Sequence, residues 1–299
     1  MYEQIAANRR KSFFLILFFL ILIGVLAYFF GRLTELGAYA VVPAFLLAGA
    51  MTWGSYYHSD KIVLAASRAK PVKKEEYPHL YHVVEGLAIA AGIPKPRCYV
   101  IRDSAPNAFA TGRSPENAVI VVTTGLMEKL NRAELEGVIA HEMSHIKNYD
   151  ILVQTLAVVM AGVVVLLSDW ILRSFLWGGG RRRRSSSGQK GGGAILVAVA
   201  LALAVLAPLF SQIIRMAVSR KREYLADASG AMLTRYPPGL ASALRKLAAD
   251  GESLKAANKA TAHLYIVNPL RSGRRGGGMS RLFSTHPPIE DRIQRLDSM

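Results

Sequence analysis

Residues 141–145 of the chain read His141-Glu142-Met143-Ser144-His145. On an α-helix, residues four apart lie on one face, so the imidazoles of His141 and His145 can meet a single metal ion. Glu142 lies one step round the helix, where its carboxylate can reach a water on the metal rather than the metal itself. Taken alone, the same pattern also occurs in helices without a catalytic role. With a third ligand elsewhere, it predicts a metal site with a carboxylate beside it.

The sequence around this stretch favours a helix. Asn131 is a suitable N-cap, and Glu134 follows three residues later, as in a capping box. Apolar residues recur at helical spacing through the same region, at Leu135, Val138, Ile139, Met143 and Ile146. The sequence therefore predicts an amphipathic helix that starts near residue 131 and carries both His residues.

Two His residues leave a metal site incomplete, because a catalytic zinc ion usually has three protein ligands and an open position. In the extended pattern His-Glu-x-x-His-x-x-Gly-x-x-His the third ligand is a His, but Asn148 and Ile151 stand where that pattern needs Gly and His. The remaining common solution is a Glu from a second helix. Residues 222–227, Arg-Glu-Tyr-Leu-Ala-Asp, place Glu223 and Asp227 on one face. Glu223 can then bind the metal while Asp227 orients a ligating imidazole.

The composition limits both the class of protein and the kind of metal site. The chain has 299 residues, of which 52% are hydrophobic and 19% charged, whereas about a quarter are charged in ordinary soluble proteins. This composition excludes a disordered or collagen-like chain. The single cysteine, Cys98, excludes a disulfide framework and a cysteine-built metal site, so the ligands have to be His, Asp or Glu.

Apolar residues are concentrated in four blocks, at 13–30, 37–57, 151–172 and 194–214. The first block is free of charge and about 27 Å long as a helix, which matches the apolar core of a bilayer. The basic residues Arg9, Arg10 and Lys11 precede it, as in a signal peptide. However, the block is longer than the roughly 7–15 apolar residues of such a peptide, and a second block follows. We therefore predict a retained membrane anchor; the third and fourth blocks form either a second membrane pair or a buried hairpin.

Outside these blocks the sequence mixes polar and apolar residues. Strand-like runs occur at Cys98–Ile101 and Ala118–Thr123, and helical stretches occur at 240–249 and from Pro287 onward. The predicted parts are two N-terminal transmembrane helices at 1–57, the first part of a soluble α+β domain at 58–150, a hydrophobic hairpin with a basic Gly/Ser loop at 151–214, and the second part of that domain at 215–299.

Four signatures occur together in the chain: the 141–145 stretch, the 222–227 stretch, Asn107-Ala108-Phe109-Ala110-Thr111-Gly112 and Ser284-Thr285-His286-Pro287-Pro288. With these signatures and its order of apolar blocks, the chain resembles the HtpX family of bacterial membrane-embedded zinc metalloproteases, relatives of the CAAX prenyl endopeptidases, over nearly its whole length. The resemblance implies a mainly α (α+β) fold, with multi-pass membrane helices and a zincin-like metalloprotease domain that carries a small β-sheet. No family role transfers to the loop at 181–184, where this chain departs from the resemblance.

The resemblance also implies roles for single residues. One zinc ion per chain is expected on His141, His145 and Glu223, with Glu142 as the catalytic acid and base. His286 matches a His that donates to the oxyanion in similar proteases; the alternative for His286 is a cap on the helix that follows.

Further residues are expected near the site. Asn107, Ala108, Phe109 and Ala110 match a segment that binds the substrate backbone in extended form, and the alternative for this segment is a surface loop. Asp150 and Arg222 can pair as support for the ligands, but a charge at a helix end explains Asp150 equally well.

The metal-site residues predict a zinc-dependent endopeptidase, and the resemblance implies that it cleaves misfolded or damaged membrane proteins. Zinc lowers the pKa of a bound water toward about 7, Glu142 accepts its proton and then passes that proton to the leaving amine. Two alternatives remain open. One is a prenyl-protein endopeptidase of the CAAX type, although four apolar blocks are few for its intramembrane chamber. The other is a non-enzymatic basic membrane scaffold.

Charge and topology predict where the protein lies. Lys and Arg number 37 against 21 Asp and Glu, a net charge of 37 − 21 = +16, and the basic residues gather beside apolar blocks and in Gly/Ser loops. This distribution points to anionic lipid headgroups of a bacterial plasma membrane and not to nucleic acid. Since His145 and Glu223 share one metal, the chain between them crosses the membrane twice or not at all. We predict a cytoplasmic active site, although two crossings would place the 181–184 loop outside, against the positive-inside tendency.

Overall fold

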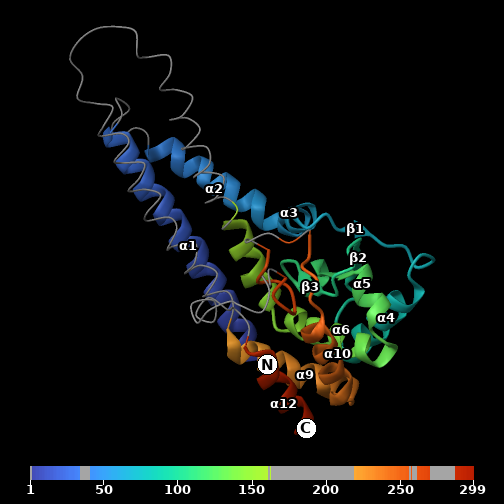
Figure 1. The fold of residues 1–299 in the computed structure, drawn as a ribbon. Helices are drawn as coiled ribbons and strands as arrows, with labels where there is room; N and C mark the ends of the chain where they lie inside the picture. Colours follow the sequence, from blue (N-terminus) through green and yellow to red (C-terminus); the bar gives the residue numbers. More distant parts are fainter. Residues whose placement is uncertain are drawn as a thin grey trace.

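The computed structural model describes residues 2–33, 41–160, 162, 219–255, 257, 261–269 and 287–299 (Figure 1). The predictions for His286, for the 181–184 loop and for most of the 151–214 hairpin fall outside these residues. Within the described part the chain is mostly helical and carries a small mixed sheet, so the predicted α+β character is confirmed.

The sheet comprises β1 (Lys70–Pro71), β2 (Arg97–Ile101), β3 (Ala108–Thr111) and β4 (Val119–Thr123), in the order β1-β2-β4-β3. β2 and β4 are parallel, whereas β1 and β3 are antiparallel to their neighbours at the two edges. β2 and β4 coincide with the two strand-like runs of the sequence, which are confirmed. All five residues of β4 are buried, because β4 lies inside the sheet and both of its faces are covered.

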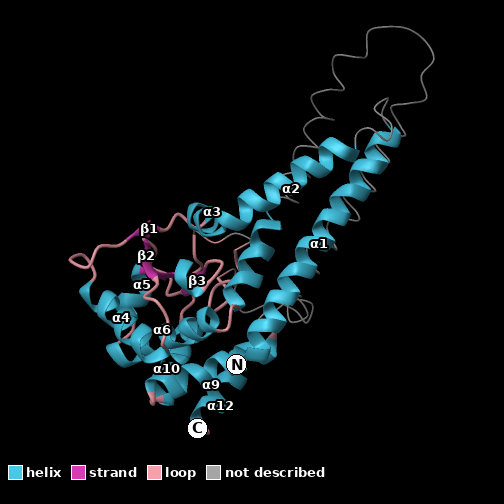
Figure 2. Ribbon diagram, turned by 180° about the vertical axis from the view of Figure 1, so that it is seen from behind, coloured by secondary structure: helices cyan, strands magenta, loops and turns pink. Residues whose placement is uncertain are grey.

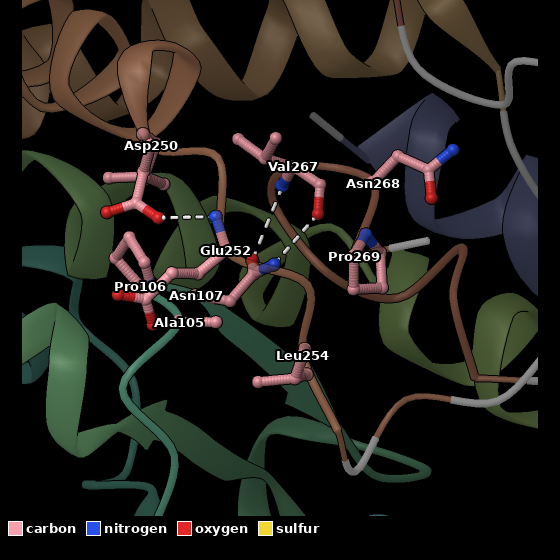
Figure 3. A pocket seen from close by; sticks show the side chains of 10 residues that line it. Ala105, Pro106, Asn107, Asp250, Glu252, Leu254, Val267, Asn268 and Pro269 are labelled. Carbon is pink, nitrogen blue, oxygen red and sulfur yellow. Dashed lines mark hydrogen bonds between the residues drawn. The ribbon is translucent and has the colours of Figure 1, made fainter. Parts of the chain in front are cut away.

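β3 is an edge strand, and a later part of the chain lies against its outer side. Its pairing with β4 leaves the peptide groups of Ala108 and Ala110 pointing away from β4. Ile266 N donates to Ala108 O at 3.0 Å. The amide of Asn107 donates to Val267 O at 2.9 Å and accepts from Val267 N at 3.4 Å (Figure 3). The chain itself therefore covers the start of this edge, and Ala110 is the next outward position.

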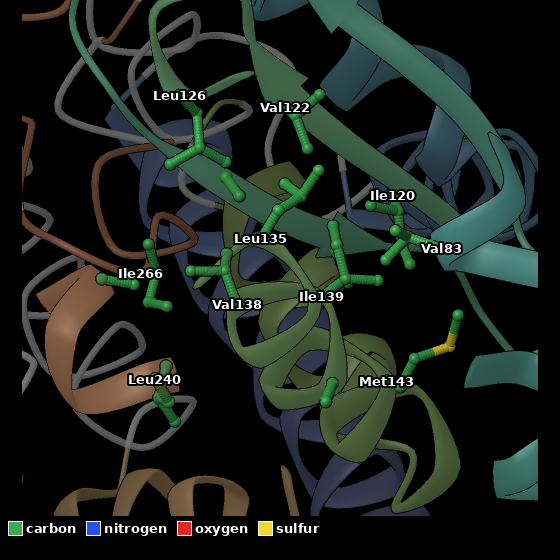
Figure 4. Packing of buried hydrophobic residues seen from close by; sticks show 14 of the residues in the cluster. Val83, Ile120, Val122, Leu126, Leu135, Val138, Ile139, Met143, Leu240 and Ile266 are labelled. Atoms are coloured by element: carbon green, nitrogen blue, oxygen red, sulfur yellow. The ribbon is translucent and has the colours of Figure 1, made fainter. Parts of the chain in front are cut away.

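The helix predicted around the two His residues is α6 (Arg132–Lys147). Its first turn is a capping box, in which Asn131 Oδ1 accepts from Glu134 N at 3.0 Å and Asn131 N donates to Glu134 Oε2 at 2.8 Å. Apolar side chains of α6 pack between β4, α4 (Pro78–Ala91) and α10 (Pro237–Ala249), as Figure 4 shows for Leu135, Val138, Ile139 and Met143. The predicted cap and apolar stripe are both confirmed.

Two glycines let neighbouring helices approach α6 closely. A Cβ on Gly230 of α9 (Arg220–Thr234) would lie 2.9 Å from the backbone nitrogen of His141, and one on Gly137 of α6 would lie 2.7 Å from that of Leu240. Real Cβ atoms do not approach so closely, so only glycine fits at either position. At Gly230 this contact brings the helix that carries Glu223 against the helix that carries the His pair.

The remaining elements are α3 (Ser59–Ala66), η2 (Pro115–Asn117), α5 (Thr124–Lys129) and α12 (Ile289–Asp297). The helical stretches predicted at 240–249 and after Pro287 correspond to α10 and α12 and are confirmed.

The long helix α1 (Tyr2–Leu33) and α2 (Val41–Tyr57) extend away from the sheet and its helices (Figures 1 and 2). The middle of α1 packs against helical residues 150–160, through a cluster formed by Leu15, Phe19, Leu22, Leu152, Val153, Leu156, Ala157 and Met160. In the part of the chain that the structure describes, none of the helices has both the length and the apolar composition needed to cross a membrane.

Candidate metal centre

Three side chains from α6 and α9 converge on one point. His141 Nε2 lies 3.2 Å from His145 Nε2, and Glu223 places one carboxylate oxygen 3.9 Å from the first nitrogen and the other 3.6 Å from the second. Two ligands of a tetrahedral metal ion at about 2.1 Å are about 3.4 Å apart. The three residues are at most 4% exposed. Their spacing and burial therefore match a set of metal ligands.

A carboxylate next to Nδ1 of each imidazole determines which ring nitrogen can bind a metal ion. His141 Nδ1 lies 2.9 Å from Asp227 Oδ1, and His145 Nδ1 lies 3.1 Å from Asp150 Oδ2. Each carboxylate accepts a hydrogen bond from an Nδ1–H group, so the lone pair of each Nε2 is directed at the shared point. Lone pairs without protons repel one another at this distance unless a cation lies between them.

The charges around this point also favour a bound cation. Four carboxylates and two guanidinium groups surround it, belonging to Glu142, Asp150, Glu223 and Asp227 and to Arg222 and Arg292. With both imidazoles neutral, the sum is 2 − 4 = −2. Burial lowers the pKa of His145, but Asp150, Glu223 and Glu142 more than compensate and raise it to about 9. A divalent metal ion would neutralise this excess, so the residues fit the ion that the sequence predicts.

Glu142 lies beside the ligands and is only 2% exposed. Burial raises the pKa of its carboxyl group to about 7, and the charge of Glu223 adds to this effect, although His145 and the N–H of Ala110 oppose it. A carboxyl group with a pKa near neutral pH can both take up and release a proton there. The hydrogen bond from Ala110 also places this carboxylate at the outward position of β3.

Arg292, on α12, belongs to the centre but was not predicted from the sequence. Its side chain is 1% exposed. It forms an ion pair with Asp227 and also donates to Ile266 O at 3.1 Å. Burial alone would raise the pKa of Asp227, but Arg292, followed by His141, lowers it to about 2. The sequence feature that could have indicated Arg292 is its position in α12, where Ile289, Arg292 and Leu296 form one buried stripe. An Arg in a buried apolar stripe indicates a buried anionic partner.

The structure also places the other predicted residues. Asp227 contacts His141, and Asp150 contacts His145 and forms an ion pair with Arg222. A further residue that the sequence did not reveal, Asn8 of α1, donates to the same Asp150 carboxylate.

The predicted substrate segment is only partly open. Asn107 and Ala108 are bonded to residues 266–267, and the ring of Phe109 packs edge-on against Tyr265 at 4.9 Å between centroids. Ala110 is the member of this segment that contacts Glu142. A small pocket lies beside Asn107, between Asp250, Glu252 and Pro269, and none of the three metal ligands lines it (Figure 3).

Comparisons with known proteins agree with this arrangement. The family model "Peptidase family M48" matches residues 74–299. A protein named Protease HtpX homolog from Dictyoglomus thermophilum is 51% identical over 298 residues, which cover 100% of this chain and 94% of the relative. A protein of the same name from Streptococcus gordonii is 42% identical over 302 residues, with 100% of both chains covered.

The fold has a solved counterpart as well. The crystal structure of S. mikatae Ste24p matches with a TM-score of 0.50 and 22% sequence identity, covering 99% of this chain and 67% of that chain. At this identity the match shows a shared fold. The resemblance read from the sequence signatures is confirmed by the family model and by the full-length relatives. The chain belongs to peptidase family M48 and is a metalloprotease.

Proposed function

We propose that the chain is a zinc-dependent endopeptidase that hydrolyses peptide bonds of misfolded or damaged proteins at the bacterial plasma membrane. One observation carries this proposal: His141, His145 and Glu223 converge on a buried point, with the carboxylate of Glu142 beside it. The ligand set of two His and one Glu is typical of catalytic zinc.

When bound, zinc supplies a Lewis acid for the hydrolysis of an amide. Glu142 accepts a proton from the attacking water and later delivers it to the leaving amine, a role that suits a carboxyl group with a pKa of about 7. Asp227 and Asp150 keep the two imidazoles in the orientation and tautomer that ligation needs. His286 is proposed as a donor to the carbonyl oxygen on which negative charge develops.

The substrate backbone is proposed to extend along the outer side of β3. Residues 266–267 already pair with Asn107 and Ala108, so the next outward position is Ala110, whose N–H donates to Glu142. Its N–H faces Glu142, which places a peptide bound there next to the proton acceptor. Backbone pairing at a strand edge is largely independent of side-chain identity, which suits a protease that accepts varied unfolded segments.

Attachment to the membrane is supported by the surfaces of α1 and α2. Large apolar side chains are exposed along both helices, including Phe13, Phe14, Ile21, Val42, Leu46 and Trp53. Exposed apolar surface of this extent is typical of a contact with lipid or protein. The basic residues that precede the first apolar block suit anionic headgroups on the cytoplasmic side, where we place the active site.

The topology has a direct test in living cells. A cysteine introduced in place of Ser186 is labelled from each side of the membrane with a reagent that does not cross it. Native Cys98 reacts poorly, because burial raises its pKa to about 11. Labelling from outside indicates that the 151–214 segment crosses the membrane twice, while labelling from the cytoplasm alone indicates that it does not cross.

The reaction is tested with the full chain purified in detergent, with casein as substrate. Wild type is expected to cleave casein and to hold about one zinc ion per chain. Glu142→Gln is expected to retain zinc and to lose at least about a hundredfold in rate. The matched control is Glu136→Gln on the same helix, whose carboxylate pairs with Arg132 at the surface. Undiminished cleavage in Glu142→Gln contradicts the mechanism, and cleavage of prenylated peptides with no action on casein favours the CAAX-type alternative.

A further inference from the structure

The turn that follows α6 carries one of the carboxylates of the metal centre. Asn148 is the C-cap of α6, Tyr149 has a φ of +60°, and Asp150 begins the helical residues that follow. A positive φ is strained for a residue with a side chain, so the turn needs contacts that hold it. Because Asp150 contacts His145, the shape of this turn decides where that ligand points.

Two neighbouring residues of α1 supply these contacts. Asn8 Nδ2 donates to Asn148 O at 2.8 Å and to Asp150 Oδ1 at 2.7 Å. Arg9 places its guanidinium 4.9 Å from the centre of the Tyr149 ring and donates to the Tyr149 hydroxyl at 3.3 Å. All three residues of the turn are therefore bonded to a helix that lies about 140 residues earlier in the chain.

Asn8 is placed by the same stripe that packs α1 onto the domain. Between residues 8 and 22, the buried residues of α1 are Asn8, Ser12, Leu15, Phe19 and Leu22, which are three or four residues apart. This spacing puts them on one face of the helix. The last three fill the apolar cluster with residues 152–160, so Asn8 is held at the end of a packed seam.

We propose that Asn8 is a positioning residue for the metal centre, acting through Asp150 on His145. The inference rests on the proposed metal site and adds α1 to it. Both amide hydrogens of Asn8 are used, one on the backbone of the turn and one on the Asp150 carboxylate. Asp150 Oδ1, which accepts from Asn8, also accepts from Arg222, and Asp150 Oδ2 contacts Nδ1 of His145. The amide fixes the carboxylate in one rotamer and adds no charge beside the ligand.

The experiment measures metal binding by the full chain in detergent, with Zn²⁺ competed by a chelator and Co²⁺ followed by visible absorption. Asn8→Leu keeps the branched shape of the side chain, with two methyl groups in place of the amide oxygen and nitrogen, and removes both donors. It is expected to weaken Zn²⁺ binding by about tenfold, the lower end of the range for residues that orient a ligand. It is also expected to change the Co²⁺ spectrum, since the spectrum reports ligand geometry. The matched control is Ser12→Ala, which alters the same stripe one turn away and is expected to match wild type.

A double-mutant cycle tests whether Asn8 acts through Asp150. If it does, Asn8→Leu combined with Asp150→Asn binds Zn²⁺ no more weakly than Asp150→Asn alone. Losses that multiply, or an Asn8→Leu protein with the Zn²⁺ affinity and Co²⁺ spectrum of wild type, overturn the inference. Folding is scored first by thermal unfolding of the metal-free protein; if Asn8→Leu does not fold, Asn8→Ser replaces it with the same two outcomes. A wild type that binds no Zn²⁺ refutes instead the proposed function.

Discussion

Arg292 binds Asp227 through two parallel hydrogen bonds, from Nε to Oδ2 at 2.8 Å and from Nη2 to Oδ1 at 2.7 Å. Because Asp227 also contacts His141, this pair connects the last helix of the chain to a metal ligand. Both side chains are at most 3% exposed, so neither charge has water as an alternative partner. The C-terminal helix is thus part of the metal centre.

Arg292→Met is expected to lower the free energy of unfolding by about 3–5 kcal/mol, because it leaves the Asp227 carboxylate buried without its cation. Metal retention should fall as well, since His141 loses a fixed partner. Chemical unfolding and metal analysis measure the two effects. Arg295→Gln on the same helix is the control: Arg295 is exposed and lies 4.0 Å from the Tyr224 ring, a contact worth about 0.5–1 kcal/mol. Equal effects of the two substitutions would contradict the role given to Arg292.

Gly230→Ala is expected to destabilise the protein by about 1–3 kcal/mol, because the added methyl group overlaps the backbone of His141. Since α9 then shifts relative to α6, metal affinity should decrease together with stability. Gly86→Ala provides the comparison, as nothing lies within 4 Å of that Cβ on α4. There the same change is expected to stabilise by about 0.5–1 kcal/mol. Thermal unfolding of both variants checks the opposite signs.

The ligand helix could be predicted because its information is local. The cap at Asn131, the apolar stripe and the spacing of the His pair all lie within one helix, and each follows from the 3.6-residue period. Glu223 and Asp227 were also accessible, since they are four apart on a second helix. A catalytic zinc ion usually needs a third protein ligand, and α9 was the segment with an acidic pair at helical spacing.

Arg292 and Asn8 could not be predicted, because their partners are distant in the sequence. Arg292 is 65 residues from Asp227, and Asn8 is 142 residues from Asp150. No periodicity in one helix specifies which distant helix it meets. The pairing of residues 266–267 with β3 has the same origin, and it reduced the predicted substrate segment to the part around Ala110.

Removal of the metal is expected to destabilise wild type, since the buried carboxylates then lose their main counter-charge: with His145 protonated at its pKa of about 9, the sum is 3 − 4 = −1. At a free Zn²⁺ concentration 100 times the Kd, binding stabilises the folded state by about 2.7 kcal/mol. A chelator should therefore lower the Tm, and added Zn²⁺ should restore it. Glu223→Gln should show no response to Zn²⁺. Without metal, this variant should be more stable than metal-free wild type, because it removes the excess negative charge; the reverse order would contradict the charge count.

Glu134, at the start of α6, is expected to make stability depend on acid pH. Burial raises the pKa of its carboxyl group, but Lys246, Ser242 and the N–H of Asn131 more than offset this and lower it. The contacts are 2.7 Å to Lys246 Nζ, 2.7 Å to Ser242 Oγ and 2.8 Å to Asn131 N. A pKa lowered by folding stabilises the folded state above the unfolded value of about 4.3, and this contribution disappears as the pH falls through the folded value.

Glu134→Gln keeps a side chain that can complete the capping box but removes the charge. The difference in unfolding free energy between wild type and this variant should be constant from pH 7 to about pH 5 and should shrink as the pH falls to about 3. Chemical unfolding at each pH measures it, and acid loss of the metal cancels because it affects both proteins. Glu136→Gln is the control on the same helix, since an exposed pair of this kind contributes only about 0.3–0.5 kcal/mol. A difference that stays constant down to pH 3 would show that the Glu134 charge does not stabilise the fold.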